Sequence, residues 1–154
     1  MKGLEIKEIS EKARQATYGI VFTSWNADIV QDLLNEARKE LLTQGVEEKN
    51  IIIKEVPGAF ELPLATQSIA ENKSVSAVIS LGAIIQGDTP HFDFISDACI
   101  NGLQTIALKT NVPIICGVLT TNTIEQAAER SDPDKMNKGK EFALSAMNMV
   151  SVLD

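Results

Sequence analysis

The sequence predicts an α/β protein in which a parallel four-stranded sheet lies between two layers of helices. The main observation is an alternation. Short apolar runs rich in β-branched residues are followed, four times in succession, by segments whose apolar residues recur at helical spacing. The apolar runs are almost continuously hydrophobic, which is typical of parallel strands covered on both faces. One further helical segment ends the chain, and right-handed crossovers would place helices on each side of the sheet.

The first two repeats have readable boundaries. The first strand is expected at residues 18–23, and its helix lies between Asn26, a candidate N-cap, and Gly45, a candidate C-cap. The second strand is expected at residues 50–56. The helix after it carries Pro63, which fits only in a first turn because proline has no N–H to donate.

The third repeat contains the most informative loop. Its strand is expected at residues 74–81, within an apolar run that continues to Ile85, and a long helical pattern follows. Thr89 is a candidate N-cap, and Pro90 suits the first helical position. The loop should therefore end at a helix N-terminus, where unpaired N–H groups and a positive dipole suit a phosphate.

The last part of the chain predicts one strand and two helices. The strand is expected at residues 112–119. Asn122 and Glu125 form a capping-box-like start for a short helix, and Asp132 with Pro133 is expected to open the final helix. With the earlier elements, this pattern predicts a flavodoxin-like three-layer α/β/α sandwich.

Composition limits the domain organisation and the possible partners. Residues 18–154 are expected to form a single domain, after a polar N-terminal arm at residues 1–17 whose apolar residues include Ile6 and Ile9. The apolar fraction of 44% and charged fraction of 23% are those of a globular protein. The net charge of −7 argues against a nucleic-acid partner, and it means that an anionic substrate needs a local positive site.

The sequence offers no cofactor motif and no metal-binding set, so we expect neither. It contains no dinucleotide-binding glycine fingerprint and no P-loop. Cys99 and Cys116 form no Cys-x-x-Cys pair, and with His91 as the only histidine they cannot provide a zinc-type ligand set. Both thiols are expected to be reduced core residues. The chain shows neither a signal-peptide core nor a membrane-spanning apolar run, so a cytoplasmic protein is expected.

The topology predicts where a ligand would bind. In open parallel sheets, ligands gather at the carboxyl ends of the strands. In the predicted fold, four loops lie at such ends, namely residues 24–26, 57–61, 82–91 and 119–122. These loops carry most of the residues in this chain that could bind a ligand or take part in catalysis.

Several of these residues suit chemistry, and each also has a simpler structural interpretation. Trp25 offers an aromatic plane, but a tryptophan at a strand end often serves packing. Glu61 offers a carboxylate, but it could simply stabilise a helix start. Thr89 begins a helix, and His91 in its first turn should be a neutral proton acceptor because the dipole disfavours imidazolium. Arg130 could simply satisfy the dipole at the end of its own helix.

Taken together, these segments resemble the 6,7-dimethyl-8-ribityllumazine synthase family, which catalyses the penultimate step of riboflavin biosynthesis. The resemblance extends from about Tyr18 to Leu153. It rests on separate motifs in one order: Trp25 with Asn26, PGAFELP at residues 57–63, GDTPHFD at residues 87–93, GVLTTNTIEQA at residues 117–127 and NKG at residues 137–139.

The resemblance implies a reaction and a set of roles. The reaction condenses 5-amino-6-(D-ribitylamino)uracil with 3,4-dihydroxy-2-butanone 4-phosphate, releases phosphate and water, and uses no cofactor. His91 corresponds to the general acid/base and Trp25 to the aromatic residue that stacks on the pyrimidine. Cys116 and Arg130 correspond to positions that reach the site from a neighbouring subunit, Arg130 toward the phosphate. The other implied substrate-binding residues are Ala59, Phe60, Glu61, Ala83, Ile84, Ile85, Asp88 and Thr89.

The resemblance also implies an assembly. Family members form homopentamers whose interfaces build the sites, and some join pentamers into a hollow icosahedral shell. The final helix carries a small apolar face, Ala143, Ala146 and Met147, that fits a buried contact between subunits. Pentamer and shell both remain open from the sequence.

The chain departs from the family pattern near the expected phosphate. Many members carry an arginine before the loop glycine and a small residue after it, where this chain has Gln86 and Asp88. Cys116 replaces a frequent aromatic residue. A carboxylate beside a phosphate is unfavourable, so we expect the Asp88 side chain to face solvent while backbone N–H groups meet the anion.

A competing interpretation is a non-catalytic protein on the same fold. Such a protein would bind a flavin or a lumazine, or would serve mainly as a shell, and fold alone does not separate these functions. His91 beside Thr89 favours the enzyme, because a protein that only binds its ligand needs no base.

Overall fold

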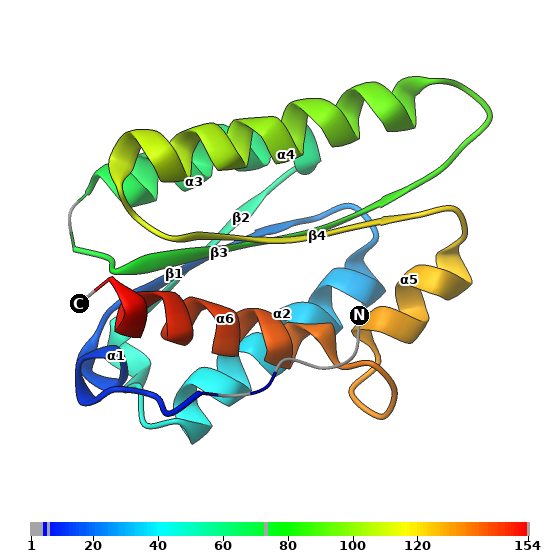
Figure 1. The fold of residues 1–154 in the computed structure, drawn as a ribbon. Coiled ribbons are helices and arrows are strands. Elements are labelled where there is room, and N and C mark those ends of the chain that lie inside the picture. Colours follow the sequence, from blue (N-terminus) through cyan, green and yellow to red (C-terminus); the bar gives the residue numbers. More distant parts are fainter. Residues whose placement is uncertain (1–4, 6, 73, 154) are drawn as a thin grey trace.

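A parallel sheet forms the centre of the computed structural model, which describes residues 5, 7–72 and 74–153. Its strands are β1 (Tyr18–Thr23), β2 (Ile51–Val56), β3 (Ala77–Ile85) and β4 (Ile114–Thr121). They pair in the order β2-β1-β3-β4, and every pair is parallel. The predicted four-stranded parallel sheet is therefore confirmed (Figure 1).

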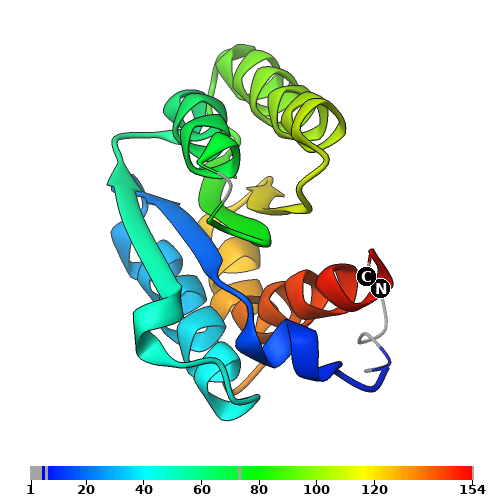
Figure 2. The same ribbon diagram turned by 90° about the vertical axis from the view of Figure 1, so that its left-hand side faces the viewer.

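Helices cover both faces of this sheet (Figures 1 and 2). The helices α3 (Leu62–Glu71) and α4 (His91–Thr110) pack together on one face. On the other face lie α1 (Glu11–Gln15), α2 (Ala27–Thr43), α5 (Ile124–Ser131) and α6 (Lys138–Val152). This arrangement confirms the flavodoxin-like three-layer sandwich. Within the described ranges, no helix is both long enough and apolar enough to cross a membrane.

Each face of the sheet has its own core. Successive strand residues point to opposite faces, so Ile20 joins the core beneath α2 and α6 while Val21 joins the core beneath α3 and α4. Both side chains are fully buried. The prediction that the strands are covered on both faces is confirmed by this division, which explains their continuous hydrophobicity.

The small apolar face of α6 is used within the chain. Ala143, Ala146 and Met147 have no exposed surface and belong to the core between α6, α2 and the sheet. The three residues thus make a buried contact, as their pattern indicated, but this contact lies within one chain and not between subunits. A stripe of alanines lets two helices approach closely, and the sequence pattern does not say whether the second helix belongs to the same chain.

The helix after β1 begins at its predicted N-cap, but its C-cap lies one residue before the predicted one. Asn26 occupies the N-cap position of α2, but its side chain makes no capping hydrogen bond, and its φ of 57° is left-handed. At the other end the C-cap is Gln44, and Gly45 follows it with a φ of 105°. The N–H groups of Gly45 and Val46 donate to Leu42 and Leu41, which is a Schellman ending that favours glycine.

Two helices on the carboxyl side of β3 and β4 begin one residue later than predicted. The N-cap of α4 is Pro90 rather than Thr89, although the Thr89 hydroxyl still accepts the His91 N–H at 3.4 Å. For α5 the capping box joins Thr123 and Gln126, rather than Asn122 and Glu125.

The last helix begins later still. The segment after Asp132 is a turn, because the Asp132 carbonyl accepts the N–H groups of Lys135 and Asn137. Helix α6 therefore begins at Lys138, with Asn137 as its N-cap, and the prediction that Asp132 and Pro133 open this helix was wrong.

Strand boundaries shifted for a tertiary reason. The prediction of residues 18–23 for β1 is confirmed. β3 continues to Ile85 and β4 to Thr121, because these two strands pair through Ile84 with Thr120 and Ile85 with Thr121. β2 begins at Ile51 because the three residues before it form a short 3-10 helix.

The predicted polar arm contains structure that its weak pattern did not reveal. Ser10 caps α1 by accepting the Ala13 N–H at 3.1 Å, and its own N–H donates to the Ser151 hydroxyl of α6. Ile9 and Ala13 are buried in the core beneath α6. Residues 1–4 and 6, which include Ile6 of the predicted arm, lie outside the described residues.

Close packing of α2 and α6 generates the first prediction. A Cβ atom at Gly139 would lie 2.5 Å from the Leu33 carbonyl oxygen, so Gly139→Ala must push the two helices apart. We expect a loss of about 1–3 kcal/mol in the free energy of unfolding, measured by urea denaturation. Gly87→Ala is the matched control, since a Cβ at Gly87 meets nothing within 4 Å. Equal stability of both variants would contradict the close approach.

The second prediction concerns Tyr18, the only tyrosine in the chain. Its hydroxyl donates to the Ala13 carbonyl at 2.7 Å, and burial raises the pKa of Tyr18 well above its ordinary value. The folded state then keeps a proton that the unfolded state loses above pH of about 10, so stability should fall there by up to about 1.4 kcal/mol per pH unit.

Tyr18→Phe provides the test of this dependence. It should lower the free energy of unfolding at neutral pH by about 1–2 kcal/mol, since the Ala13 carbonyl loses its donor. It should also remove the contribution of Tyr18 to the loss of stability at alkaline pH. Urea denaturation at several pH values measures this loss. Phenolate absorbance appearing in the folded wild-type protein near pH 10 would contradict the argument.

Candidate active site

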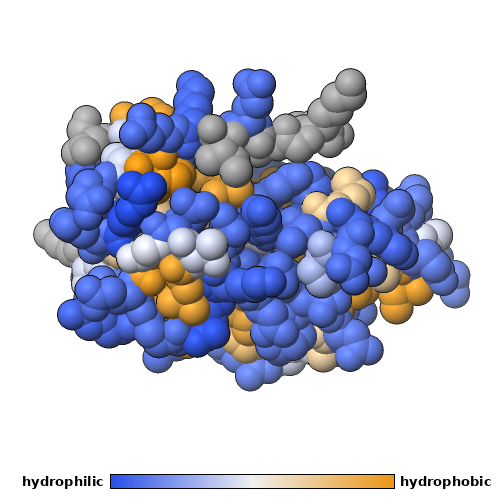
Figure 3. Space-filling view, turned by 90° about the horizontal axis from the view of Figure 1, so that it is seen from below, coloured by the Kyte–Doolittle hydropathy of each residue, from blue (hydrophilic) through white to orange (hydrophobic). Residues whose placement is uncertain are grey.

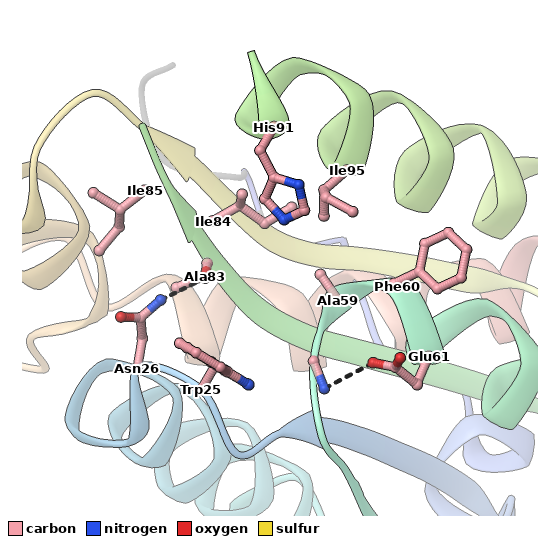
Figure 4. A pocket seen from close by; sticks show the side chains of 11 residues that line it. Trp25, Asn26, Ala59, Phe60, Glu61, Ala83, Ile84, Ile85, His91 and Ile95 are labelled. Carbon is pink, nitrogen blue, oxygen red and sulfur yellow. Dashed lines mark hydrogen bonds between the residues drawn. The ribbon is translucent and has the colours of Figure 1, made fainter. Parts of the chain in front are cut away.

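A pocket of about 700 Å³ opens at the carboxyl ends of β1, β2 and β3 (Figure 4). This edge lies beside the point where the chain order reverses, because β1 has β2 on one side and β3 on the other. Ligands bind at such switch points in open α/β sheets. The lining residues are Trp25, Asn26, Gly58, Ala59, Phe60, Glu61, Ala83, Ile84, Ile85, His91 and Ile95.

The loop after β1 provides an aromatic wall. Trp25 is 73% exposed, and its backbone N–H donates to the Pro57 carbonyl at 3.3 Å. A Cβ built at Gly58 would lie 3.6 Å from Trp25 Cδ1, so the indole packs closely beside this glycine. The exposed indole leaves room for a second flat ring against it, and packing alone does not explain such an exposure.

The loop after β2 provides the adjoining wall and a carboxylate. A short 3-10 turn, Ala59–Glu61, leads directly into α3. Glu61 Oε2 accepts the Gly58 N–H at 3.1 Å, so this carboxylate closes its own loop (Figure 4). The predicted structural role at a helix start is therefore present. A carboxylate has four lone-pair sites, and the remaining ones can accept bonds from ligand hydroxyls.

The end of β3 and the start of α4 form the third wall. Ala83, Ile84 and Ile85 line the floor of the pocket as β3 ends. His91 is the first residue of α4, and its imidazole projects from the helix toward Ile84 and Ile95 (Figure 4). The histidine is exposed and belongs to the lining, so it can reach a bound molecule.

Four residues named by the family resemblance lie outside this lining. Asp88 and Thr89 are exposed in the loop between β3 and α4. Arg130 lies in the last turn of α5, where its Nη1 donates to the Gln126 carbonyl at 2.9 Å, as in the simpler structural interpretation. Cys116 is exposed on β4, at the edge of the sheet.

The two cysteines differ in environment. Cys99 lies on the buried face of α4, and burial raises the pKa of its thiol to about 12, so the thiol stays protonated and unreactive. The expectation that Cys116 is also a core residue was wrong, because an edge strand leaves one side of its chain uncovered.

Reasoning from the sequence did not assign Asn26, Gly58 or Ile95 to the site. Asn26 was interpreted as a helix cap and as part of a family motif, but its bond to Ala83 joins segments far apart in the sequence and has no local signal. Gly58 lay in a loop that was singled out for its neighbours. Ile95 could have been found, since it follows His91 by four residues and thus shares its helix face.

The pocket has few charged side chains in its lining. Its lining contains one carboxylate and one histidine, and among the described lining residues none is lysine or arginine. Lys138, from the NKG motif, is half-buried and paired with Glu141 at 2.7 Å. In the part of the chain that the structure describes, no cluster of three or more histidine, cysteine or carboxylate residues could hold a metal ion.

Comparison with known families gives a match over almost the whole chain. The family model described as 6,7-dimethyl-8-ribityllumazine synthase matches residues 15–154. The matched region includes every strand of the sheet and every residue that lines the pocket.

Proposed function

Because the chain belongs to the 6,7-dimethyl-8-ribityllumazine synthase family of riboflavin biosynthesis, we propose that it condenses 5-amino-6-(D-ribitylamino)uracil with 3,4-dihydroxy-2-butanone 4-phosphate. The products are 6,7-dimethyl-8-(D-ribityl)lumazine, phosphate and water. One observation carries this proposal: a single pocket at the switch point brings together an aromatic plane, a carboxylate and the only histidine.

The walls suit the ribitylaminouracil. Trp25 stacks on the flat pyrimidine, for which its exposed indole is available. The ribityl hydroxyls donate to Glu61 and to backbone groups of Ala59 and Phe60. The end of β3, from Ala83 to Ile85, contacts the ring edge with backbone groups and apolar side chains.

His91 is the proton-transfer residue in this proposal. Formation of an imine between the amine and the ketone, and elimination of phosphate, both require proton transfers at neutral pH. The exposed imidazole at the start of α4 can exchange protons with solvent between these steps. Holding both substrates in one pocket supplies much of the acceleration, since it converts a bimolecular reaction into a unimolecular one.

The phosphate is held at the mouth of the pocket. Backbone N–H groups of Asp88 and Thr89 and the N-terminus of α4 offer partial positive charge, while the exposed Asp88 carboxylate faces solvent. Arg130 provides the full positive charge from a neighbouring subunit, and Cys116 of a neighbour lies beside the ring. One subunit's lining lacks such a cation, which agrees with a site completed by a second subunit.

The proposed assembly is a homopentamer, with an icosahedral shell of pentamers as its larger form. Large apolar side chains are exposed on the layer of α3 and α4: Leu64, Phe94 and Leu108 are 76%, 70% and 75% exposed. The opposite face, over α2 and α6, is mainly hydrophilic with scattered apolar residues (Figure 3). The exposed apolar side chains of α3 and α4 support burial of this layer against another subunit.

The experiment that tests the function mixes the purified protein with both substrates and follows the lumazine by absorbance and fluorescence. We expect a rate clearly above the uncatalysed condensation. His91→Ala should lower kcat by about 10²-fold or less and leave a residual acceleration, because proximity remains. An absence of acceleration by the folded, assembled wild-type protein would contradict the enzyme and favour a binding or shell protein.

Asp88 generates a prediction about affinity. A carboxylate near a bound phosphate dianion opposes it by about 1 kcal/mol through water. Asp88→Asn should therefore lower KM for the phosphate substrate severalfold, while KM for the uracil stays unchanged. The effect should shrink at high salt, since exposed charges are screened. An increase in KM would mean that the carboxylate itself contacts the substrate.

Sedimentation velocity tests the assembly. The wild-type protein should sediment as a pentamer or as a multiple of it, and a monomer at micromolar concentration would contradict the proposal. Leu108→Lys places a charge on the exposed apolar surface of α4 and should shift the distribution toward smaller species. Unchanged circular dichroism of the variant would show that the shift comes from association and not from unfolding.

A further inference from the structure

Asn26 differs from the other pocket residues in its left-handed backbone conformation. Its φ and ψ of 57° and 48° lie in the left-handed region, which most side chains avoid. The other described residues with positive φ that are not glycine are Asn111 and Asn137, and both lie at helix ends away from the pocket. A left-handed residue in a pocket wall aims its side chain differently from an ordinary N-cap.

The side chain of Asn26 joins two walls of the pocket. Its Nδ2 donates to the Ala83 carbonyl at 2.8 Å, across 57 residues of sequence (Figure 4). Pairing between β1 and β3 ends at Phe22 and Leu81. The amide therefore continues the connection of these strands two residues farther along β3, at the point where the backbone of β1 has turned away toward α2.

The backbone of Trp25 is hydrogen-bonded through both its N–H and its carbonyl group. Its N–H donates to Pro57, and the Thr23 hydroxyl donates to its carbonyl at 3.4 Å. The Asn26 carbonyl accepts the first N–H groups of α2, from Ile29 and Val30, at 3.1 Å each. The indole itself is 73% exposed, so its direction depends on this backbone.

We propose that Asn26 is a positioning residue, whose bond to the Ala83 carbonyl fixes the β1–α2 loop and thereby the indole of Trp25 over the pocket floor. The kinetic consequence of this inference rests on the proposed function, in which the indole stacks on the uracil. The expected effect on the loop does not rest on the proposed function, because it concerns the protein without substrate.

Asn26→Asp separates the bond from the other properties of this residue. Aspartate has nearly the same shape, tolerates the left-handed region and suits a helix N-terminus. It replaces the only N–H donor of the side chain by an acceptor, which the Ala83 carbonyl repels. Asn26→Gly is the second variant, since glycine keeps the backbone conformation without any side chain.

Trp25 is the only tryptophan in the chain, so its fluorescence reports on this loop alone. In the substrate-free assembled protein, both Asn26 variants should show a lower fluorescence anisotropy of Trp25, because the indole moves more on the nanosecond timescale. Both should also lose on the order of tenfold in kcat/KM, as expected for one hydrogen bond to a buried carbonyl. Asn111→Asp, the matched control at the end of α4, should leave anisotropy and kcat/KM unchanged.

Two results would overturn the inference. Unchanged anisotropy and unchanged kcat/KM in Asn26→Asp would show that the bond to Ala83 positions nothing. Reduced kcat/KM with unchanged Trp25 anisotropy would mean that Asn26 acts by touching the substrate. If the wild-type protein has no synthase activity, the anisotropy comparison still decides the inference, so its failure is distinct from failure of the proposed function.

Discussion

The strand order β2-β1-β3-β4 is the constraint on which the site depends. After β1 the chain turns to the face that carries α2, and after β3 it turns to the face that carries α4 (Figures 1 and 2). Two neighbouring strands thus send their loops in opposite directions, and a crevice opens between the loops. Trp25 stands on one side of this crevice and His91 on the other.

Two polar side chains that line the crevice also hold its loops in place by hydrogen bonds. Glu61 accepts the N–H of Gly58, and Asn26 donates to the carbonyl of Ala83. The first bond closes the loop after β2, and the second joins the loop after β1 to β3 beyond the last pair between β1 and β3. In the proposed positioning role, a change at Asn26 alters the geometry of the pocket wall even when no ligand is bound.

Charge links the site to the proposed assembly. The whole chain has a net charge of −7, and the described lining of the pocket contains no lysine or arginine. An anionic substrate needs a positive group near it, and within this subunit Arg130 turns to its own helix carbonyl. In the proposed pentamer, neighbouring subunits supply the missing cation and cover the apolar surface of α4.

The sequence by itself determined the alternation of strands and helices, the parallel sheet and the loops that carry Trp25, Glu61 and His91, because periodicity and strand ends are local signals. Helix starts near Thr89 and Asn122 were placed one residue early, since neighbouring residues offer similar caps. Only the tertiary structure decided that α6 packs on α2, that Cys116 lies on an exposed edge, and that Asn26 reaches Ala83. Each of these depends on contacts between segments far apart in the chain, which no local pattern encodes.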